Sequence, residues 1–535
     1  MSTGSIAPGV FDAQAAPVSR AGALDTPPAA PGSGVEYGAR RLVIVTAILL
    51  ATLMQTLDTT IIMVALPYIQ GNLGATLDEA TWITTGFIIA NVVVIPLTPW
   101  LQRRFGRKQY FIASIVGFTV ASVLCGMAQS LDQLIAARVV QGAFGGGLLA
   151  VAQSLLRDTF PEDQLGLSQG LFAIGAIVGP AIGPTLGGIL TDQLSWRWVF
   201  DINVVPGILS AFLLWLYLRN TEQPQRVPLD AAGLSLLAVG LGSFQYVLDE
   251  GERNDWFNDG TIVACSVVAA VGLIAFVAWE LRAKNPIVAL RALGHRSIAA
   301  GSAIGLALGF PLLGSVFMLP QYVNVLLNYT ATLSGLLILV RAAPIALLTP
   351  LVGVLAQRVD ARLLLGVGVL IVSGGTIWQA LIMTSDTPFA TLVAPLVLQG
   401  IGTAFLAVPL LVNVLGSVGT ELTATASSFL NLSFQLGGSI ASAVLVTILD
   451  RRLAFHLSTL AGTTGRPQIV GILQAAGRHR RELLVGLSQL IEQQAAAMTF
   501  ADVFLVIAAA TFAVLPLVLA LRRASSSGPI PLTME

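Results

Sequence analysis

The chain has 535 residues, of which 55% are hydrophobic and only 10% are charged. A soluble domain is about 45–50% apolar and about 25% charged, so this composition excludes an ordinary soluble protein. A spanning helix needs about 20 mostly apolar residues, and the chain has enough of them for a polytopic membrane protein. Because the 28 basic residues are balanced by 28 acidic ones, there is no positive excess for phosphates, and we expect no nucleic-acid partner.

In chain order, residues 1–40 come first, and their Pro, Ala, Gly and Ser content predicts a disordered tail. The apolar segments that follow are separated by charged or turn-rich breaks and predict an all-α fold with fourteen transmembrane helices. Residues 522–535 form a second tail. The predicted helices are 41–66, 80–101, 110–129, 133–156, 167–190, 198–218, 230–249, 260–282, 297–322, 332–355, 362–383, 389–414, 425–449 and 500–521.

The charges of the loops predict how the chain is oriented in the membrane. An even number of spans places both termini on one side, and the loops of that side carry most of the basic residues, so both termini are expected in the cytoplasm. The exception is the segment 451–499 on the other side, with Arg451, Arg452, Arg466, Arg478, Arg480 and Arg481. Its apolar residues recur at roughly helical spacing, as in an amphipathic cap over the bundle or a docking helix for a partner. They are Ile469, Ile472, Leu473, Leu483, Leu484, Leu487, Leu490 and Ile491.

The sequence offers little for catalysis. Cys125 and Cys265 lie in apolar runs, which indicates small core residues and neither a disulfide framework nor a metal site. No cofactor is expected, and no GxxxxGK[ST] motif for a nucleotide occurs. A membrane-embedded transferase would need acids or histidines clustered at one membrane face, and the sequence has no such cluster. We therefore expect a transporter that is not an enzyme.

Two short basic loops indicate an internal repeat. LQRRFGRK (residues 101–108) follows the second predicted helix, and GVLAQRVDAR (residues 353–362) follows the tenth. Two six-helix halves with two helices inserted between them would give this offset, and such repeats are typical of transporters that rock two bundles around a central site. The predicted units are 41–218, a linker with helices 7 and 8 at 219–296, and 297–521, which includes the loop 451–499.

Several sequence motifs, in the order in which a known family has them, add a family resemblance. They include LDTTIIMVALP (residues 57–67), LIAARVVQG (134–142), GAIVGPAIGPTLGG (175–188) and WRWVFDINVVPG (196–207). Together they resemble the major facilitator superfamily in its fourteen-helix drug:proton antiporter branch, the EmrB/QacA type.

The resemblance implies a major facilitator fold (6 + 2 + 6) in the bacterial cytoplasmic membrane. It also implies proton-driven export of small amphipathic, drug-like compounds by alternating access, and hence antibiotic resistance. The alternative is a specialised transporter of one metabolite, siderophore or lipid on the same scaffold. Some members of the branch work with a periplasmic adaptor, which makes 451–499 a candidate docking segment.

Three charges lie well inside the predicted spans: Asp58, Arg138 and Arg341. A charge in a membrane is costly and is by default a functional hypothesis. Low dielectric favours the protonated form of a carboxyl, and a nearby guanidinium favours the ionised form. We therefore predict that Asp58 is the proton site, with Arg138 and Gln141 as partners; a static ion pair is the alternative. For Arg341 the alternatives are a counter-charge to a helix end or to Asp58, and a cavity cation for an anionic or zwitterionic substrate.

Small residues predict where helices approach closely. Gly175, Gly179, Gly183 and Gly187 share one helical face, beside Gly188 and the helix-kinking Pro180 and Pro184. This face is predicted to be a tight packing seam and, compatibly, the seam between the two bundles that seals the cytoplasmic or outer gate.

The two basic loops predict topology anchoring or a cytoplasmic latch, in which arginines meet acids or helix C-termini of the other bundle. The residues concerned are Arg104, Gly106 and Arg107 in the first half and Arg358 and Asp360 in the second.

Overall fold

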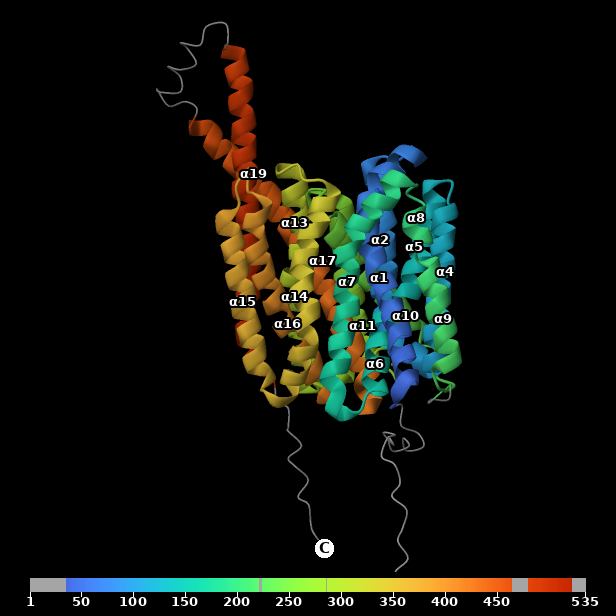
Figure 1. The fold of residues 1–535 in the computed structure, drawn as a ribbon. Coiled ribbons are helices and arrows are strands. Elements are labelled where there is room, and N and C mark those ends of the chain that lie inside the picture. The colour runs from blue at the N-terminus through green and yellow to red at the C-terminus, as the bar shows by residue number, and fades with distance from the viewer. Residues whose placement is uncertain (1–34, 221–223, 285, 464–479, 522–535) are drawn as a thin grey trace, which may run out of the picture.

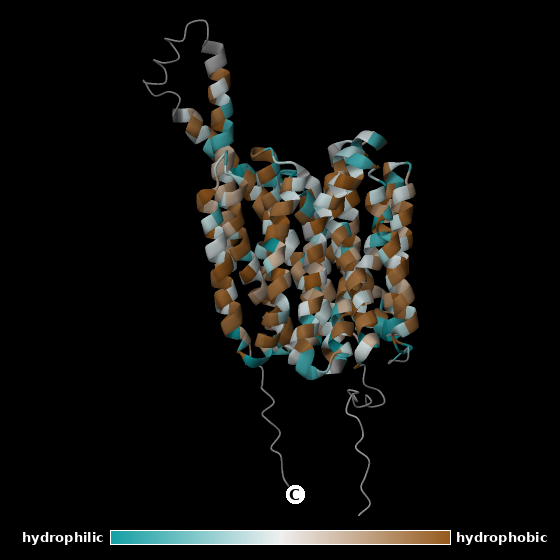
Figure 2. Ribbon diagram, in the orientation of Figure 1, coloured by the Kyte–Doolittle hydropathy of each residue, from teal (hydrophilic) through white to brown (hydrophobic). Residues whose placement is uncertain are grey.

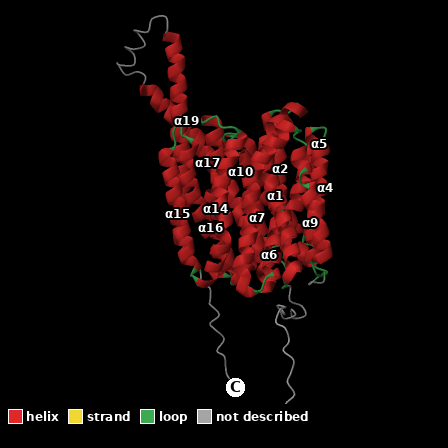
Figure 3. Cartoon of the chain, viewed as in Figure 1, coloured by secondary structure: helices red, strands yellow, loops and turns green. Residues whose placement is uncertain are grey.

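The computed structural model describes residues 35–220, 224–284, 286–463 and 480–521. These residues form helices and short connections without strands (Figure 3). Fourteen helical segments are long and apolar enough to cross a membrane, which confirms the predicted number. The middle of the helices is mainly hydrophobic, and hydrophilic residues gather toward the ends (Figure 2), as a bilayer requires.

The N-terminal half holds the first six spans, several of which consist of more than one helix. Pro96 and Pro99 divide the second span, because proline lacks the amide hydrogen that continues a helix. The elements are α1 (Gly38–Leu73), α2 (Leu77–Val94), η1 (Ile95–Leu97), α3 (Thr98–Phe105), α4 (Arg107–Met127), α5 (Leu131–Gly145), α6 (Leu148–Thr159), η2 (Glu162–Gln164), α7 (Leu165–Gln193), α8 (Trp198–Asp201) and α9 (Val204–Tyr217).

Two further spans, α10 (Ala231–Glu250) and α11 (Gly260–Glu280), pack on each other. Between them lies η3 (Trp256–Asn258), and η4 (Leu290–Gly294) follows. Helix α10 contacts α2 and also α17 of the C-terminal half, so the inserted pair touches both halves.

The C-terminal half holds the last six spans. Its first span is broken by two π-helical turns, η5 and η6, and contains Pro311 and Pro320. The elements are α12 (Arg296–Ala307), η5 (Phe310–Gly314), α13 (Ser315–Gln321), η6 (Tyr322–Leu326), α14 (Ala331–Arg358), α15 (Ala361–Ile382), α16 (Phe389–Gly416), α17 (Thr420–Thr463), α19 (Arg480–Phe512) and α20 (Leu515–Ala520).

Helix α1 begins and α20 ends at the same end of the bundle, the lower end in Figure 1. We name this end the terminal face and the other end the opposite face. At the terminal face the two basic loops make matching contacts. Lys108 donates to the backbone oxygen of Leu218, just after α9, and Arg362 donates to that of Leu521, just after α20. Cations stabilise helix C-termini, so the repeat predicted from these loops recurs in their contacts.

The prediction of a loop at 451–499 is wrong for the part of this segment that the structure describes. Helix α17 continues to Thr463 and α19 starts at Arg480, so both spans continue as helices that project beyond the opposite face (Figure 1). A cap lying over the bundle is excluded for these residues, whereas Ile469, Ile472 and Leu473 lie outside the described part. Asp502 joins the two helices near the base of the projection, because its Oδ2 contacts Arg452 at 2.6 Å and His456 at 2.7 Å.

Candidate functional site

A buried polar network surrounds Asp58 in the N-terminal half. Its Oδ2 accepts from Nη1 of Arg138 at 2.6 Å. Its Oδ1 accepts from Nε2 of Gln141 at 3.0 Å and from Nδ2 of Asn203 at 2.8 Å. Gln141 and Asn203 also donate to the Ser122 hydroxyl, at 3.2 and 3.0 Å. The carboxylate is thus held by one cation and two amides, and the structure brings the three predicted residues into contact.

The network crosslinks four of the six spans in this half. Asp58 lies in α1, Ser122 in α4, and Arg138 and Gln141 in α5, where a spacing of three residues places them on one face. Asn203 lies between α8 and α9. A change in the charge of one carboxyl therefore acts on several helix contacts at once.

The network is closed to solvent in this state. Asp58 is 1% exposed and Arg138 is 0% exposed. The Phe87 ring lies over the guanidinium, 4.1 Å from its central carbon, and Nε of Arg138 donates to the Ile83 carbonyl at 3.2 Å. Because a buried ion pair that loses one charge leaves the other uncompensated, protonation of Asp58 would destabilise this arrangement.

Sequence reasoning missed two members of the network, Ser122 and Asn203. Asn203 stands inside the motif WRWVFDINVVPG, which was the available signal. Cys125 is buried, as expected of a core residue, and its sulfur lies 3.6 Å from Oε1 of Gln141.

Arg341 lies in the C-terminal half and does not reach Asp58, so the prediction that it is a counter-charge to Asp58 is wrong. It is 4% exposed and donates from Nη2 to the Pro311 carbonyl of η5 at 2.6 Å. Its Nε is enclosed without a hydrogen-bond partner in the described part of the chain. This guanidinium is therefore a buried cation that a backbone oxygen, and no carboxylate of the described residues, holds.

The glycine face of α7 packs within its own half. A Cβ on Gly179 would lie 2.1 Å from the Thr56 hydroxyl, and one on Gly187 would lie 2.8 Å from the Ile61 carbonyl, both in α1. Gly175 and Gly183 also face α1, Gly188 is buried, and Pro180 and Pro184 lie inside α7. The seam is therefore a packing seam, and its assignment to the boundary between the halves is wrong.

Other glycines form that boundary, where α7 packs along α14. A Cβ on Gly166 would lie 1.8 Å from the Gly353 carbonyl oxygen, and one on Gly353 would lie 2.2 Å from the Gly166 oxygen. Nearer the opposite face, Gly335 leaves room for Thr185. At the contact of Gly166 with Gly353 the backbones are so close that glycine is required on both helices.

The predicted latch residues have different surroundings. Arg107 forms an ion pair with Asp158 of its own half, and Gly106 provides the positive φ of 83° that turns α3 into α4. Arg358 is exposed, and Asp360 caps α15 by accepting from the Arg362 amide at 3.0 Å.

An arginine does meet a helix C-terminus of the other half, but it is Arg157. Its Nη2 donates to the Val418 carbonyl, just after α16, at 3.1 Å. Two more bonds join the halves nearby: Ser428 donates to the Ile95 carbonyl at 2.5 Å, and Asn431 donates to Gln153 at 2.9 Å. All three bonds lie nearer to the terminal face than to the opposite face, so the N- and C-terminal halves are held together near the terminal face.

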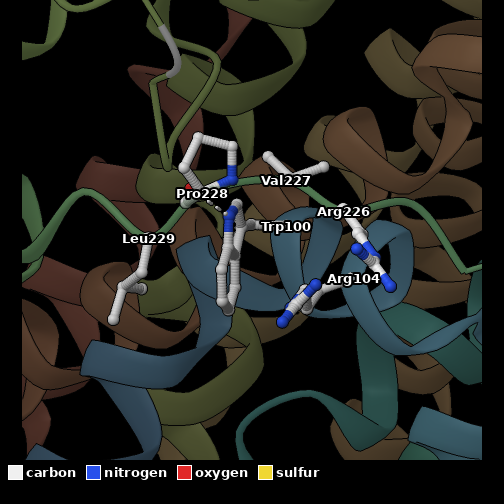
Figure 4. A pocket seen from close by; sticks show the side chains of 6 residues that line it. All are labelled: Trp100, Arg104, Arg226, Val227, Pro228 and Leu229. Carbon is white, nitrogen blue, oxygen red and sulfur yellow. Dashed lines mark hydrogen bonds between the residues drawn. The ribbon is translucent and has the colours of Figure 1, made fainter.

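Arg104 lines an open hollow of about 450 Å³ at this face, together with Trp100 and Arg226 (Figure 4). Trp100 donates to the Pro228 carbonyl at 3.3 Å, which ties the linker before α10 to α3. The hollow lies outside the network around Asp58.

Comparisons with known proteins agree with this architecture. The Major Facilitator Superfamily model matches residues 48–442. Multidrug export protein EmrB of Escherichia coli K12 is 36% identical over 79% of this chain and 83% of its own length. Fatty acid resistance protein FarB of Neisseria gonorrhoeae is 37% identical over 77% and 81%.

Solved structures share the fold at low sequence identity. A human organic anion transporter has a TM-score of 0.59 at 13% identity and covers 89% of this chain and 100% of its own. The proton:xylose symporter XylE has a TM-score of 0.54 at 12% identity and covers 88% and 95%. With its fourteen spans, the chain belongs to the major facilitator superfamily and to its EmrB/QacA-type branch.

Proposed function

We propose that this protein exports small amphipathic, drug-like compounds and that protons moving inward drive the export. The names of its EmrB relatives support the multidrug part of the proposal. The positive-inside rule supports a cytoplasmic terminal face, and the family supports a bacterial inner membrane. The observation that carries the coupling is the buried ion pair of Asp58 and Arg138, at 2.6 Å.

The proposed coupling follows from the charge balance of that pair. When Asp58 takes up a proton, the carboxyl no longer neutralises Arg138, and the bonds among α1, α4, α5 and Asn203 rearrange. Release of the proton restores the pair. Because one ionisable carboxyl controls contacts of several spans, proton transfer biases the orientation of the whole half, which is the differential interaction that a conformational switch needs.

The test is drug efflux in everted membrane vesicles that carry wild type or Asp58→Asn. Asparagine keeps the shape of the carboxyl and one of its two acceptor oxygens, and it cannot take up a proton at physiological pH. We expect wild-type vesicles to accumulate ethidium when a pH gradient is imposed and the variant to lose the gradient-driven part. Full gradient-driven accumulation in the variant would contradict the coupling.

A second candidate is export of anionic amphipaths, which is closer to the specialised-transporter alternative. The FarB relative is named for fatty acid resistance, and Arg341 provides a buried cation without a carboxylate partner. Parallel vesicle assays with an amphipathic carboxylate and with ethidium distinguish the two. Transport of the carboxylate alone would favour the specialised function.

We also propose that the projecting parts of α17 and α19 dock a periplasmic adaptor. They extend beyond the opposite face (Figure 1) and expose Phe455, Leu484, Val485 and Leu490. The test is recovery of the adaptor in pull-downs with the full chain and with a variant that lacks the projection, residues 453–501. Equal recovery would remove the projection from the interface.

A further inference from the structure

The residues of the two halves can be aligned with each other because the same kinds of contact recur in both halves. Thr76 and Thr330 both cap a helix by accepting from the amide three residues later, at 3.3 Å. Lys108 and Arg362 both bind the C-terminus of a last helix. The same number of residues separates Thr76 from Thr330 and Lys108 from Arg362. At this offset Phe87 of α2 corresponds to Arg341 of α14.

Glycine contacts give the same register independently. A Cβ on Gly142 would lie 2.3 Å from the Phe87 carbonyl, and a Cβ on Gly400 would lie 2.3 Å from the Arg341 carbonyl. Each glycine follows a glutamine, Gln141 in one half and Gln399 in the other. In the C-terminal half, Arg341 therefore occupies the position that Phe87 occupies next to the Asp58 network in the N-terminal half.

The first helices of the halves also correspond. Gly179 packs on Thr56 of α1, and Gly437 packs on Gly309 just before η5. Two residues after Thr56 is Asp58, and two residues after Gly309 is Pro311. The position of the carboxylate in the N-terminal half is thus a proline in the C-terminal half.

The halves differ in how the cation is neutralised. Arg138 has the Asp58 carboxylate at 2.6 Å. Among the described residues Arg341 has only the Pro311 carbonyl. Each guanidinium has one enclosed nitrogen without a partner there, Nη2 in Arg138 and Nε in Arg341, so the difference between them is the carboxylate. An intramembrane cation is a functional-site hypothesis by default, and a bound anion would neutralise a guanidinium that a backbone carbonyl leaves charged. Next to it, Ile338 and Ala342 form a buried apolar cluster with Leu339.

We propose that Arg341 binds the carboxylate of amphipathic anionic substrates, in the position that an aspartate would fill if the two halves were identical. The inference rests on the proposed export function and names a substrate class for it. The substrate carboxylate replaces the Pro311 carbonyl as the acceptor for the guanidinium, and its apolar body lies along the cluster of Ile338 and Ala342. Arg341 is 4% exposed here, so the substrate reaches it in another state of the transport cycle.

The experiment measures pH-gradient-driven uptake of radiolabelled cholate, an amphipathic carboxylate, and of ethidium, a permanent cation, in proteoliposomes. The variants are Arg341→Gln, Arg341→Lys, Pro311→Asp and Pro311→Ala. Pro311→Asp gives Arg341 the internal counter-ion that Arg138 has, whereas Pro311→Ala keeps the backbone carbonyl and serves as its matched control. Thermal unfolding of each purified variant shows whether it is folded.

We expect Arg341→Gln and Pro311→Asp to lower cholate uptake about tenfold or more, the loss of one charge-assisted contact. Ethidium uptake should stay within about twofold, and Arg341→Lys and Pro311→Ala should retain cholate uptake. Equal losses of both substrates in folded variants, or wild-type cholate uptake in Pro311→Asp, would overturn the proposal. If wild type transports neither substrate, the proposed export function itself fails, which is a distinguishable result.

Discussion

The boundary between α7 and α14 predicts a large effect of one methyl group. A Cβ on Gly166 would lie 1.8 Å from the Gly353 carbonyl oxygen, whereas an ordinary contact begins at 3.4 Å. Gly166→Ala therefore requires the two backbones to separate by roughly 1.5 Å, and backbone atoms cannot yield as a side chain does. Overpacking of this kind costs about 1–3 kcal/mol. If that cost falls on the state in which the halves touch at the terminal face, the equilibrium shifts about 5- to 150-fold toward the open state.

A residue on the same helix provides the control. The atoms nearest to a Cβ on Gly175 would be side-chain atoms of Leu49 and Thr52, the closest at 3.2 Å. These atoms can move by a few tenths of an ångström, and alanine is the better helix former by about 1 kcal/mol. Gly175→Ala should therefore be close to neutral and should leave the equilibrium unchanged.

The assay is the distance between spin labels on the two halves at the terminal face. Exposed Arg103 of α3 and Arg358 of α14 are suitable positions, in a background in which Cys125 and Cys265 are replaced. We expect Gly166→Ala to raise the population of long distances and Gly175→Ala to leave the distribution of the parent. An unchanged distribution in Gly166→Ala, or an equal shift in both variants, would refute the reasoning.

Two further predictions concern single contacts. Asn203→Leu removes two hydrogen bonds of the Asp58 network and should lower stability by about 1–3 kcal/mol; unfolding of the purified variant with an unchanged midpoint would contradict it. Arg157→Gln removes the bond to Val418 and should shift the spin-label distances in the same direction as Gly166→Ala, but less. A shift toward shorter distances would contradict the role of Arg157 in holding the halves together.

The sequence was most informative where charge is rare. Asp58 and Arg138 could be paired because an isolated charge in a span is costly, and the spacing of Arg138 and Gln141 placed both on one helix face. Ser122 and Asn203 could not be assigned, because neutral polar residues are common in spans and helix periodicity does not show which neighbour a face meets.

The same limit explains the glycines. A spacing of four predicted that Gly175, Gly179, Gly183 and Gly187 pack closely, but the partner of that face depends on tertiary packing. The seam between the halves uses Gly166 and Gly170 of α7 and Gly335 and Gly353 of α14, and two glycines on each helix are too few to stand out as a stripe in the sequence. The span predicted to end at 449 continues to Thr463, because arginines such as Arg451 and Arg452 end an apolar run without ending a helix.

The central claim is that Asp58 carries the coupled proton, and proton flux tests it most directly. In proteoliposomes, an ethidium gradient should drive a counter-flux of protons through wild type, read with an internal pH dye. Asp58→Asn should still exchange labelled for unlabelled ethidium, which needs no proton, but should show no proton flux. Proton flux of wild-type size in the exchanging variant would contradict the account.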